Sequence, residues 1–343
     1  MIKDILAYAA KNKCSDVLIS TGSCPFVKIS GDLIKIPKSS ELSAQQVTDM
    51  IFSVMTQEQM DKYNNILEID FAYNLDNIAR FRVNAFNTLN GPAIAFRVIS
   101  SQARKLEEIS NCPQIIYELL EKKSGLVIVS GPTGSGKSTT LAAMINHINE
   151  NRNYNIITIE DPIEYIHTNK KSLILQKEVG SHTKSFSNGL RNSLREIPDV
   201  IMVGEIRDKE TCALAITAAE TGHLVFATLH SRTAPQTISR VIDMFDAQEK
   251  NIIRSMLADS INAVILQQLV KNNQNQLSSV FEIMVGSQSI KNLIREDKIS
   301  QIPSMMEIGQ KFGMLTFKDA IKNLVAANQI SQSTADQYLS VNN

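Results

Sequence analysis

The sequence predicts an α/β protein in which a buried parallel sheet forms the main domain and a smaller α+β domain precedes it. Short apolar runs at residues 126–129, 156–159, 200–203 and 224–229 alternate with helical stretches. Strands that are apolar at every position are buried on both faces, as in a parallel sheet covered by helices. A glycine-rich turn joins the first run to a helix, and 343 residues suffice for about two domains at ~150 residues each.

The first hundred residues have a different pattern, with alternating strands and short helices. Ser43 and Gln46 form a capping-box pattern that opens one of these helices. Turn residues Ser30 and Gly31 interrupt a long strand pattern. The expected elements are helices at 3–10 and 43–55 and strands at 17–20, 27–36, 71–73, 79–88 and 94–99.

A polar stretch at 101–112, followed by Pro113, is the expected linker between the domains. The predicted organisation is therefore an N-terminal domain at 1–100, the linker, and a main domain at 113–343. In the main domain we expect one long amphipathic helix at 248–268 and a mostly helical C-terminal part at 287–343.

Composition excludes several classes of protein. Thirty-five Lys and Arg residues balance 35 Asp and Glu residues, so a broadly basic surface for nucleic acid is not expected. No stretch approaches the ~18 apolar residues of a membrane-spanning helix, and the N-terminus lacks the apolar segment of a signal peptide. The four cysteines are scattered without a CxxC pair, which favours isolated thiols over a zinc site or disulfides. We expect a cytoplasmic protein that contacts a membrane only through partners.

The glycine-rich turn fits the pattern G-x-x-x-x-G-K-[ST], which predicts a site for ATP with Mg²⁺. Its glycines allow backbone N–H groups to surround a phosphate, and the following helix directs its positive end toward the same anion. Lys137 is expected to reach the outer phosphates, and the Ser138 hydroxyl to ligate Mg²⁺. The expected nucleotide-binding residues are Gly131, Pro132, Thr133, Gly134, Ser135, Gly136, Lys137, Ser138 and Thr139.

Hydrolysis requires a carboxylate that holds the metal or orients water. Glu205 follows the run at 200–203, and Glu160 and Glu164 follow the run at 156–159. Because ligands collect at the carboxyl ends of parallel strands, all three acids are candidates. Glu205 is also a candidate metal ligand, and the sequence leaves open which glutamate activates the water.

Two of the five histidines, His223 and His230, bracket the run at 224–229. Metal ligation by the pair is not expected, because a strand of about 20 Å separates them. Either could sense the γ-phosphate or contact a neighbouring subunit.

Arg80 and Arg82 alternate with Phe81 and Val83, so both arginines project from one face of their strand. Arg97 lies on the next predicted strand. Guanidinium groups in a domain without its own phosphate loop suit phosphate contact in trans, as arginine fingers. A solvated sheet face is the alternative.

Taken in order, these segments resemble the secretion ATPase superfamily of type II secretion systems and type IV pili, and most closely its retraction-type members. The resemblance covers nearly the whole chain. In family terms, 131–144 is the Walker A motif, 157–165 the Asp box, 194–208 the Walker B motif and 217–230 the His box. Residues 290–296 resemble a motif of retraction ATPases, although Ser289 and Lys291 replace the usual Ala and Arg.

The resemblance implies a homo-hexameric motor that powers pilus retraction. Each subunit would pair a PAS-like N-terminal domain with a RecA-like P-loop NTPase core, with nucleotide between the domains and against a neighbour. The partner would be an inner-membrane pilus platform protein, with no nucleic acid bound. Two positions depart from the family pattern: Leu18 stands where His is common, and Ile197 where Asp is usual.

Alternatives remain open at the level of sequence. Within the superfamily they are an assembly, competence or type IV secretion ATPase. The absence of an extra N-terminal domain and of a four-cysteine site favours the retraction type. Outside it they are a RecA-like nucleic-acid translocase and a nucleotide-binding regulator without turnover.

Overall fold

The computed structural model describes residues 1–12, 14–29, 31–75, 78–99 and 103–341. The chain divides into two compact units. The first comprises residues 1–102 with 164–166, and the second comprises 103–163 with 167–343. Ser30 and residues 101 and 102 of the expected linker lie outside the described residues. Residues 103–112 belong to the second unit, in which Leu106 and Ile109 are buried.

The first unit is an antiparallel sheet with helices on one face. Its strands are paired in the order β3-β2-β1-β6-β5-β4. The predicted strand at 79–88 is confirmed, and the remaining predicted elements are present within a few residues. Its elements are α1 Ile2–Lys11, β1 Asp16–Ser20, β2 Phe26–Ile29, β3 Asp32–Lys35, α2 Ala44–Phe52, α3 Gln57–Ile66, β4 Glu68–Leu75, β5 Ala79–Thr88 and β6 Gly91–Ile99.

Alternation along the strands places apolar side chains on one face of this sheet and arginine side chains on the other. Phe81, Val83 and Phe96 are fully buried in the core of the unit. Arg82 is exposed, and its Cα pairs with that of Arg97 on the neighbouring strand. The aromatic residues therefore hold the helices, while the arginines lie together on the open face.

The second unit contains a mostly parallel sheet in the order β13-β12-β7-β11-β10-β8-β9, in which only the β12–β13 pair is antiparallel among the described strands. The predicted α/β class is confirmed. The four predicted apolar runs are the buried strands β7, β8, β10 and β11. The strands are β7 Gly125–Ser130, β8 Asn155–Glu160, β9 Leu173–Glu178, β10 Val200–Val203, β11 Leu224–Leu229, β12 Ile261–Lys271 and β13 Leu277–Val285.

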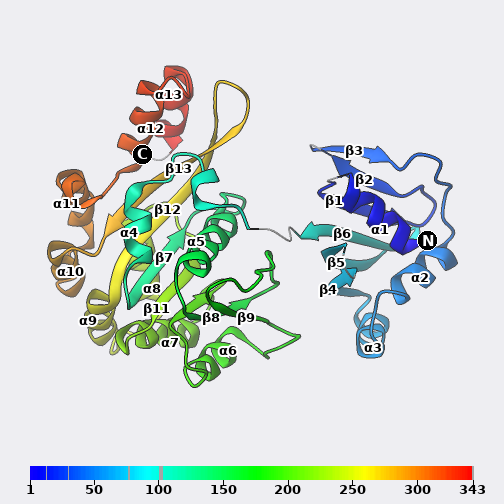
Figure 1. Ribbon diagram of the computed structural model, residues 1–343, viewed down its shortest axis with the longest axis horizontal. Coiled ribbons are helices and arrows are strands. Elements are labelled where there is room, and N and C mark those ends of the chain that lie inside the picture. The colour runs from blue at the N-terminus through cyan, green and yellow to red at the C-terminus, as the bar shows by residue number, and fades with distance from the viewer. Residues whose placement is uncertain (13, 30, 76–77, 100–102, 342–343) are drawn as a thin grey trace. The chain divides into compact units, whose positions relative to one another are not determined.

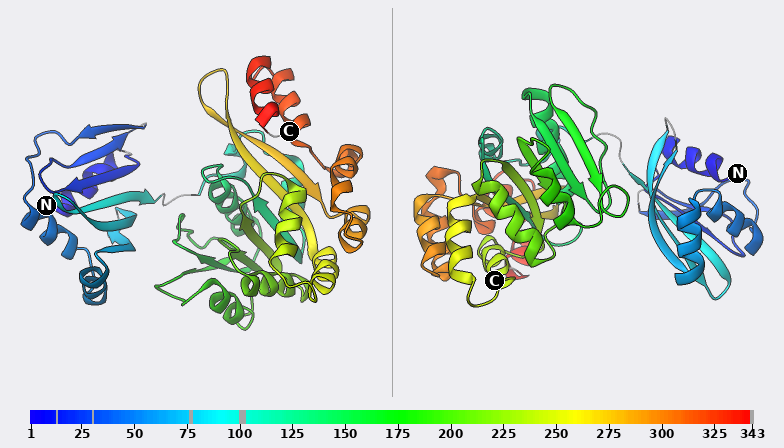
Figure 2. Two further views of the ribbon diagram at one scale, coloured as in Figure 1. Left: turned by 180° about the vertical axis from the view of Figure 1, so that it is seen from behind. Right: turned by 90° about the horizontal axis from the view of Figure 1, so that it is seen from below.

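Helices cover both faces of this sheet (Figures 1 and 2). Helices α4 and α5 pack in one core cluster, and helices α6 to α11 pack in the other. The helices are α4 Gln114–Leu120, α5 Lys137–Asn151, α6 Phe186–Ser193, α7 Lys209–Glu220, α8 Ala234–Asp243, α9 Lys250–Ser260, α10 Gln288–Arg295, α11 Ile302–Ile308, α12 Phe317–Ala326 and α13 Gln332–Val341, with short 3₁₀ turns at Leu106–Glu108, Ile299–Gln301 and Gln310–Phe312.

The prediction of one helix at 248–268 is wrong. Helix α9 ends at Ser260, and the chain continues directly into β12. Residues 263–266 are fully apolar and buried between β7 and β13, and a buried strand of this kind cannot be distinguished from a buried helix by periodicity alone. Strands β9 and β13 and helix α3 were also not predicted. Helix α3 buries only Tyr63, so its sequence carries almost no apolar pattern.

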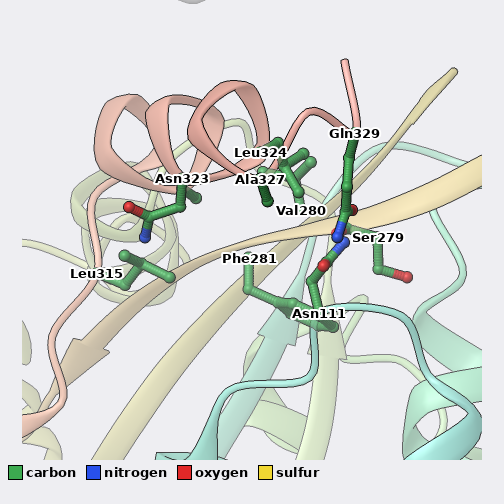
Figure 3. A pocket seen from close by; sticks show the side chains of 10 residues that line it. Asn111, Ser279, Val280, Phe281, Leu315, Asn323, Leu324, Ala327 and Gln329 are labelled. Atoms are coloured by element: carbon green, nitrogen blue, oxygen red, sulfur yellow. The ribbon is translucent and has the colours of Figure 1, made fainter. Parts of the chain in front are cut away.

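At the edge of the sheet, α12, β13 and the turn at Asn111 enclose a hollow of about 220 Å³, which Leu324 of α12 and Phe281 of β13 line from opposite sides (Figure 3). Each of the four cysteines is a free thiol. None of the helices in the described ranges has the length and apolar content needed to cross a bilayer.

Candidate nucleotide site

The glycine-rich loop joins β7 to α5, and its backbone requires glycine at several positions. Gly131, Gly134 and Gly136 have φ angles of 145°, 79° and 88°. A Cβ on Gly131 would lie 2.3 Å from the backbone oxygen of Gln267, whereas nothing lies within 4 Å of a Cβ on Gly134. The loop thus packs against β12 at its start and is open at its tip.

The residues of this loop fit a phosphate group. Gly136 precedes α5 without a side chain to cap it, so the first N–H groups of a 15-residue helix are left for an anion. The Ser135 hydroxyl is buried and has no hydrogen-bond partner in the described part of the chain. Donors gathered around an open concave backbone are what a phosphate requires.

Lys137 lies beneath this loop and is only 8% exposed. Its Nζ donates to the carbonyl oxygens of Gly131, at 2.8 Å, and Pro132, at 2.9 Å. The same ammonium lies 3.5 Å from Nδ1 of His230. The cation is therefore held between the loop and the end of the neighbouring strand β11.

His230 connects this lysine to Glu205. Its Nε2 lies 3.2 Å from Oε1 of Glu205, which follows β10. An ammonium group only donates and a carboxylate only accepts, so the imidazole that satisfies both contacts carries its proton on Nε2 and accepts at Nδ1. The structure thus brings together three of the predicted site residues, which follow the three adjacent strands β7, β11 and β10.

Arg207 holds the other oxygen of Glu205, and sequence reasoning missed it. Its Nε donates to Glu205 Oε2 at 2.7 Å, and its Nη1 lies 3.3 Å from Asp161 Oδ2. The hydrogen bond that Arg207 donates to Glu205 raises the pKa of the guanidinium. The position of Arg207, two residues after a strand-end acid, is the signal that could have identified it.

Glu160, at the end of β8, lies one strand farther from the loop. A spacing of ~4.8 Å per strand puts the ends of β10 and β8 roughly 10 Å and 14 Å from the end of β7. Glu160 is only 8% exposed, so it does not lie in a solvated turn. Its Oε1 accepts from Thr158 Oγ1 at 2.8 Å and from Gln176 Nε2 at 3.2 Å.

The orientation of the Gln176 amide follows from its other contact. Its Oε1 accepts from the backbone N–H of His167 at 2.9 Å, so its NH₂ group must face Glu160. Sequence reasoning missed Gln176 because it lies on β9, a strand that was not predicted.

Glu164 differs from Glu160. It is exposed and groups with the first compact unit, so it is not among the buried acids at the strand ends. A further buried acid, Glu178, fixes the segment between them: it is 3% exposed, and its Oε2 accepts from the backbone N–H of Ile163 at 3.0 Å.

The remaining predicted residues are placed elsewhere. His223 lies at the opposite end of β11 from His230, where its Nδ1 is 2.9 Å from the carbonyl oxygen of Ala218 in α7. Arg80, Arg82 and Arg97 belong to the first unit. Arg97 pairs with Asp16 at 3.0 Å while remaining 69% exposed, so the predicted arginine face also carries an acid.

The chain matches the family model described as type II/IV secretion system protein over residues 1–337. It is 50% identical over 312 residues to a twitching motility protein of Neisseria gonorrhoeae, covering 91% of this chain and 83% of the relative. It is 45% identical over 334 residues to the type IV pilus retraction ATPase PilT of Pseudomonas aeruginosa, covering 97% and 96%. A crystal structure of the pilus retraction motor PilT with bound ADP superposes with a TM-score of 0.91 at 37% identity, covering 97% of this chain and 95% of the other.

Proposed function

This chain belongs to the family of type II/IV secretion system proteins, and we propose that it is the ATPase that powers retraction of type IV pili. The single observation that carries the proposal is the contact series Lys137–His230–Glu205 at the open end of the glycine-rich loop. High identity to a twitching motility protein and to a retraction ATPase, over most of each chain, supports the choice within the family.

The described residues suggest how ATP is held. The loop amides and the N-terminus of α5 surround the phosphates, and Lys137 leaves the loop carbonyls to contact the outer phosphates. Ser138 and Glu205 supply oxygen ligands of the kind Mg²⁺ prefers, and the bound ion would neutralise charge on the phosphates.

For the hydrolytic step, we assign Glu205 to the metal side of the site and Glu160 to orienting the attacking water. Glu205 is already shared between His230 and Arg207, next to the lysine. Glu160 lies one strand farther out and accepts hydrogen bonds from Thr158 and Gln176. His230 connects the metal side to Lys137, a position from which it would sense the γ-phosphate.

In the assembled motor, which we propose to be a homo-hexamer, Arg80, Arg82 and Arg97 act as arginine fingers. The cations stabilise charge that develops on the transferred phosphoryl group. The motor works in the cytoplasm on an inner-membrane platform protein of the pilus.

The test is a deletion of the gene in its source organism, with surface pili counted and twitching motility measured. A retraction ATPase predicts more surface pili and no twitching. Loss of pili would instead identify an assembly ATPase. ATPase stimulation by DNA in the purified protein would favour a nucleic-acid translocase.

A further inference from the structure

A buried carboxylate outside the site connects two helix N-termini. Glu282 lies on β13 and is only 8% exposed. Its Oε1 accepts from the backbone N–H of Ala234 at 2.7 Å, and its Oε2 accepts from the backbone N–H of Phe317 at 3.3 Å. Ala234 and Phe317 are the first residues of α8 and α12.

The two helices need this acceptor for the same reason. Thr233 and Thr316 cap them, and each threonine side chain accepts from the third residue of its helix, Gln236 and Asp319. The N–H of the first residue is left over in both cases. The Glu282 carboxylate accepts hydrogen bonds from both of these N–H groups, and the positive ends of both helices stabilise its charge.

Glu282 binds the start of α8, which begins only four residues after His230 in the sequence. The Ser231 N–H donates to Ser130 Oγ at 3.0 Å, at the end of β7. Arg240, within α8, donates from Nη1 to the carbonyl oxygen of His230 at 2.8 Å. The place of α8 therefore sets the backbone that carries the imidazole between Lys137 and Glu205.

We propose that Glu282 is a positioning residue for His230, and that it ties the C-terminal helix α12 to the ATPase site through α8. This rests on the proposed ATPase function. Helix α12 packs on β13 through Phe317, Ile321 and Leu324, so the carboxylate is the polar part of a larger contact (Figure 1). Burial raises the pKa of Glu282, while the two amides lower it, as expected for a desolvated acid held by backbone donors.

The first experiment is amide hydrogen exchange of the wild-type protein, with residue resolution and without nucleotide. Phe186 is the matched control: it is 7% exposed like Phe317, it starts α6 behind the Ser185 cap, and no carboxylate accepts from its N–H in the described residues. We expect the Ala234 and Phe317 amides to exchange at least roughly 10-fold more slowly than that of Phe186. If the Ala234 and Phe317 amides exchanged as fast as the Phe186 amide, this measurement on the wild type alone would overturn the proposal.

The second experiment compares Glu282→Gln with Thr316→Ala. Gln keeps the shape but offers one neutral oxygen in place of two charged carboxylate oxygens, so the hydrogen bonds to both helix starts weaken and both amides should exchange faster. We expect the ATPase kcat of Glu282→Gln to fall about 10-fold, while its KM for ATP stays within about 2-fold of the wild-type value. Normalising kcat to the amount of bound nucleotide excludes unfolded protein from the comparison. Thr316→Ala weakens the start of α12 alone and should leave both kcat and the exchange of Ala234 unchanged.

Two results would contradict the positioning role. One is an unchanged kcat in Glu282→Gln. The other is faster exchange at Phe317 alone, which would mean that the carboxylate only caps α12. If the wild-type protein hydrolyses no ATP, the proposed function fails, while the exchange measurement still decides whether Glu282 joins the two helices.

Discussion

His230 donates from Nε2 to Glu205 across 3.2 Å while its Nδ1 faces the ammonium of Lys137 at 3.5 Å. One neutral imidazole thus joins the lysine of the glycine-rich loop to the acid at the end of β10. If Lys137 moved when phosphate binds, the contact with His230 would therefore transmit the movement to the Glu205 side chain.

This relationship predicts that His230→Phe impairs turnover more than binding. The ring volume is kept, but Glu205 loses the donor that orients it, and such supporting contacts are worth roughly 10- to 100-fold in activity. Steady-state ATPase assays and binding of a fluorescent ATP analogue should show reduced kcat with affinity changed by only a few-fold. His223→Phe, at the other end of β11, is the comparison and should have a much smaller effect; equal losses in both variants would argue against the relay.

Gln176→Leu should lower kcat by about 10-fold and leave KM for ATP nearly unchanged. The amide donates a hydrogen bond to Glu160, and its loss removes a contact that orients the carboxylate. Gln176→Glu, which places a second carboxylate there, should be worse. ATPase assays of both variants test the assignment of Glu160, and it would fail if either variant turned over ATP like the wild type.

Ile197→Asn should stabilise the protein by about 1 kcal/mol. Ile197 has φ of 55° and is 87% exposed, so a β-branched side chain adopts a left-handed backbone without burial in return. Asn tolerates this conformation. Urea unfolding measures the change, and ATPase activity should not move.

Ile252→Asn is the control for that substitution, because Ile252 is 63% exposed within α9. Its backbone is helical, and Asn favours helix slightly less than Ile, so no stabilisation is expected. Similar effects in the two variants would contradict the role assigned to backbone strain.

The stability of the second unit should fall in mild acid because of His167. Burial lowers the pKa of His167 from 6.5 to about 4. The unfolded chain therefore binds more protons between these values, and stability that is complete above pH 6.5 is lost as the pH falls toward 4. Between pH 7.5 and pH 5 this amounts to about 2 kcal/mol.

Urea unfolding of wild type and His167→Gln at both pH values checks this. The variant should lose about 2 kcal/mol less than the wild type over that interval, because Gln does not titrate. Parallel loss of stability in the two proteins would show that His167 is not buried in its neutral form.

The sequence was most informative where one local rule decides the structure. The strands β7, β8, β10 and β11 contain short, largely apolar runs and are buried along nearly their whole length. The residues from Gly131 to Ser138 have the spacing of a phosphate-binding loop. Lys137 was predicted from the spacing of the glycine-rich pattern, and Glu205 and His230 because each follows the end of an apolar strand.

What the sequence did not reveal depends on packing between distant segments. β12 was taken for a helix because its apolar run has no period of its own. Gln176 becomes a functional candidate only when β9 is brought beside Glu160. Glu282 is 48 residues from its partner Ala234, and nothing in its local sequence points to a buried bridge.

ATP hydrolysis by the purified protein with Mg²⁺, compared with that of Lys137→Ala, tests the central claim most directly. The account predicts turnover in the wild type and a loss of about 100-fold or more in the variant, because we propose that the ammonium beneath the loop contacts the outer phosphates. If Lys137→Ala hydrolysed ATP as fast as the wild type, the result would contradict this account.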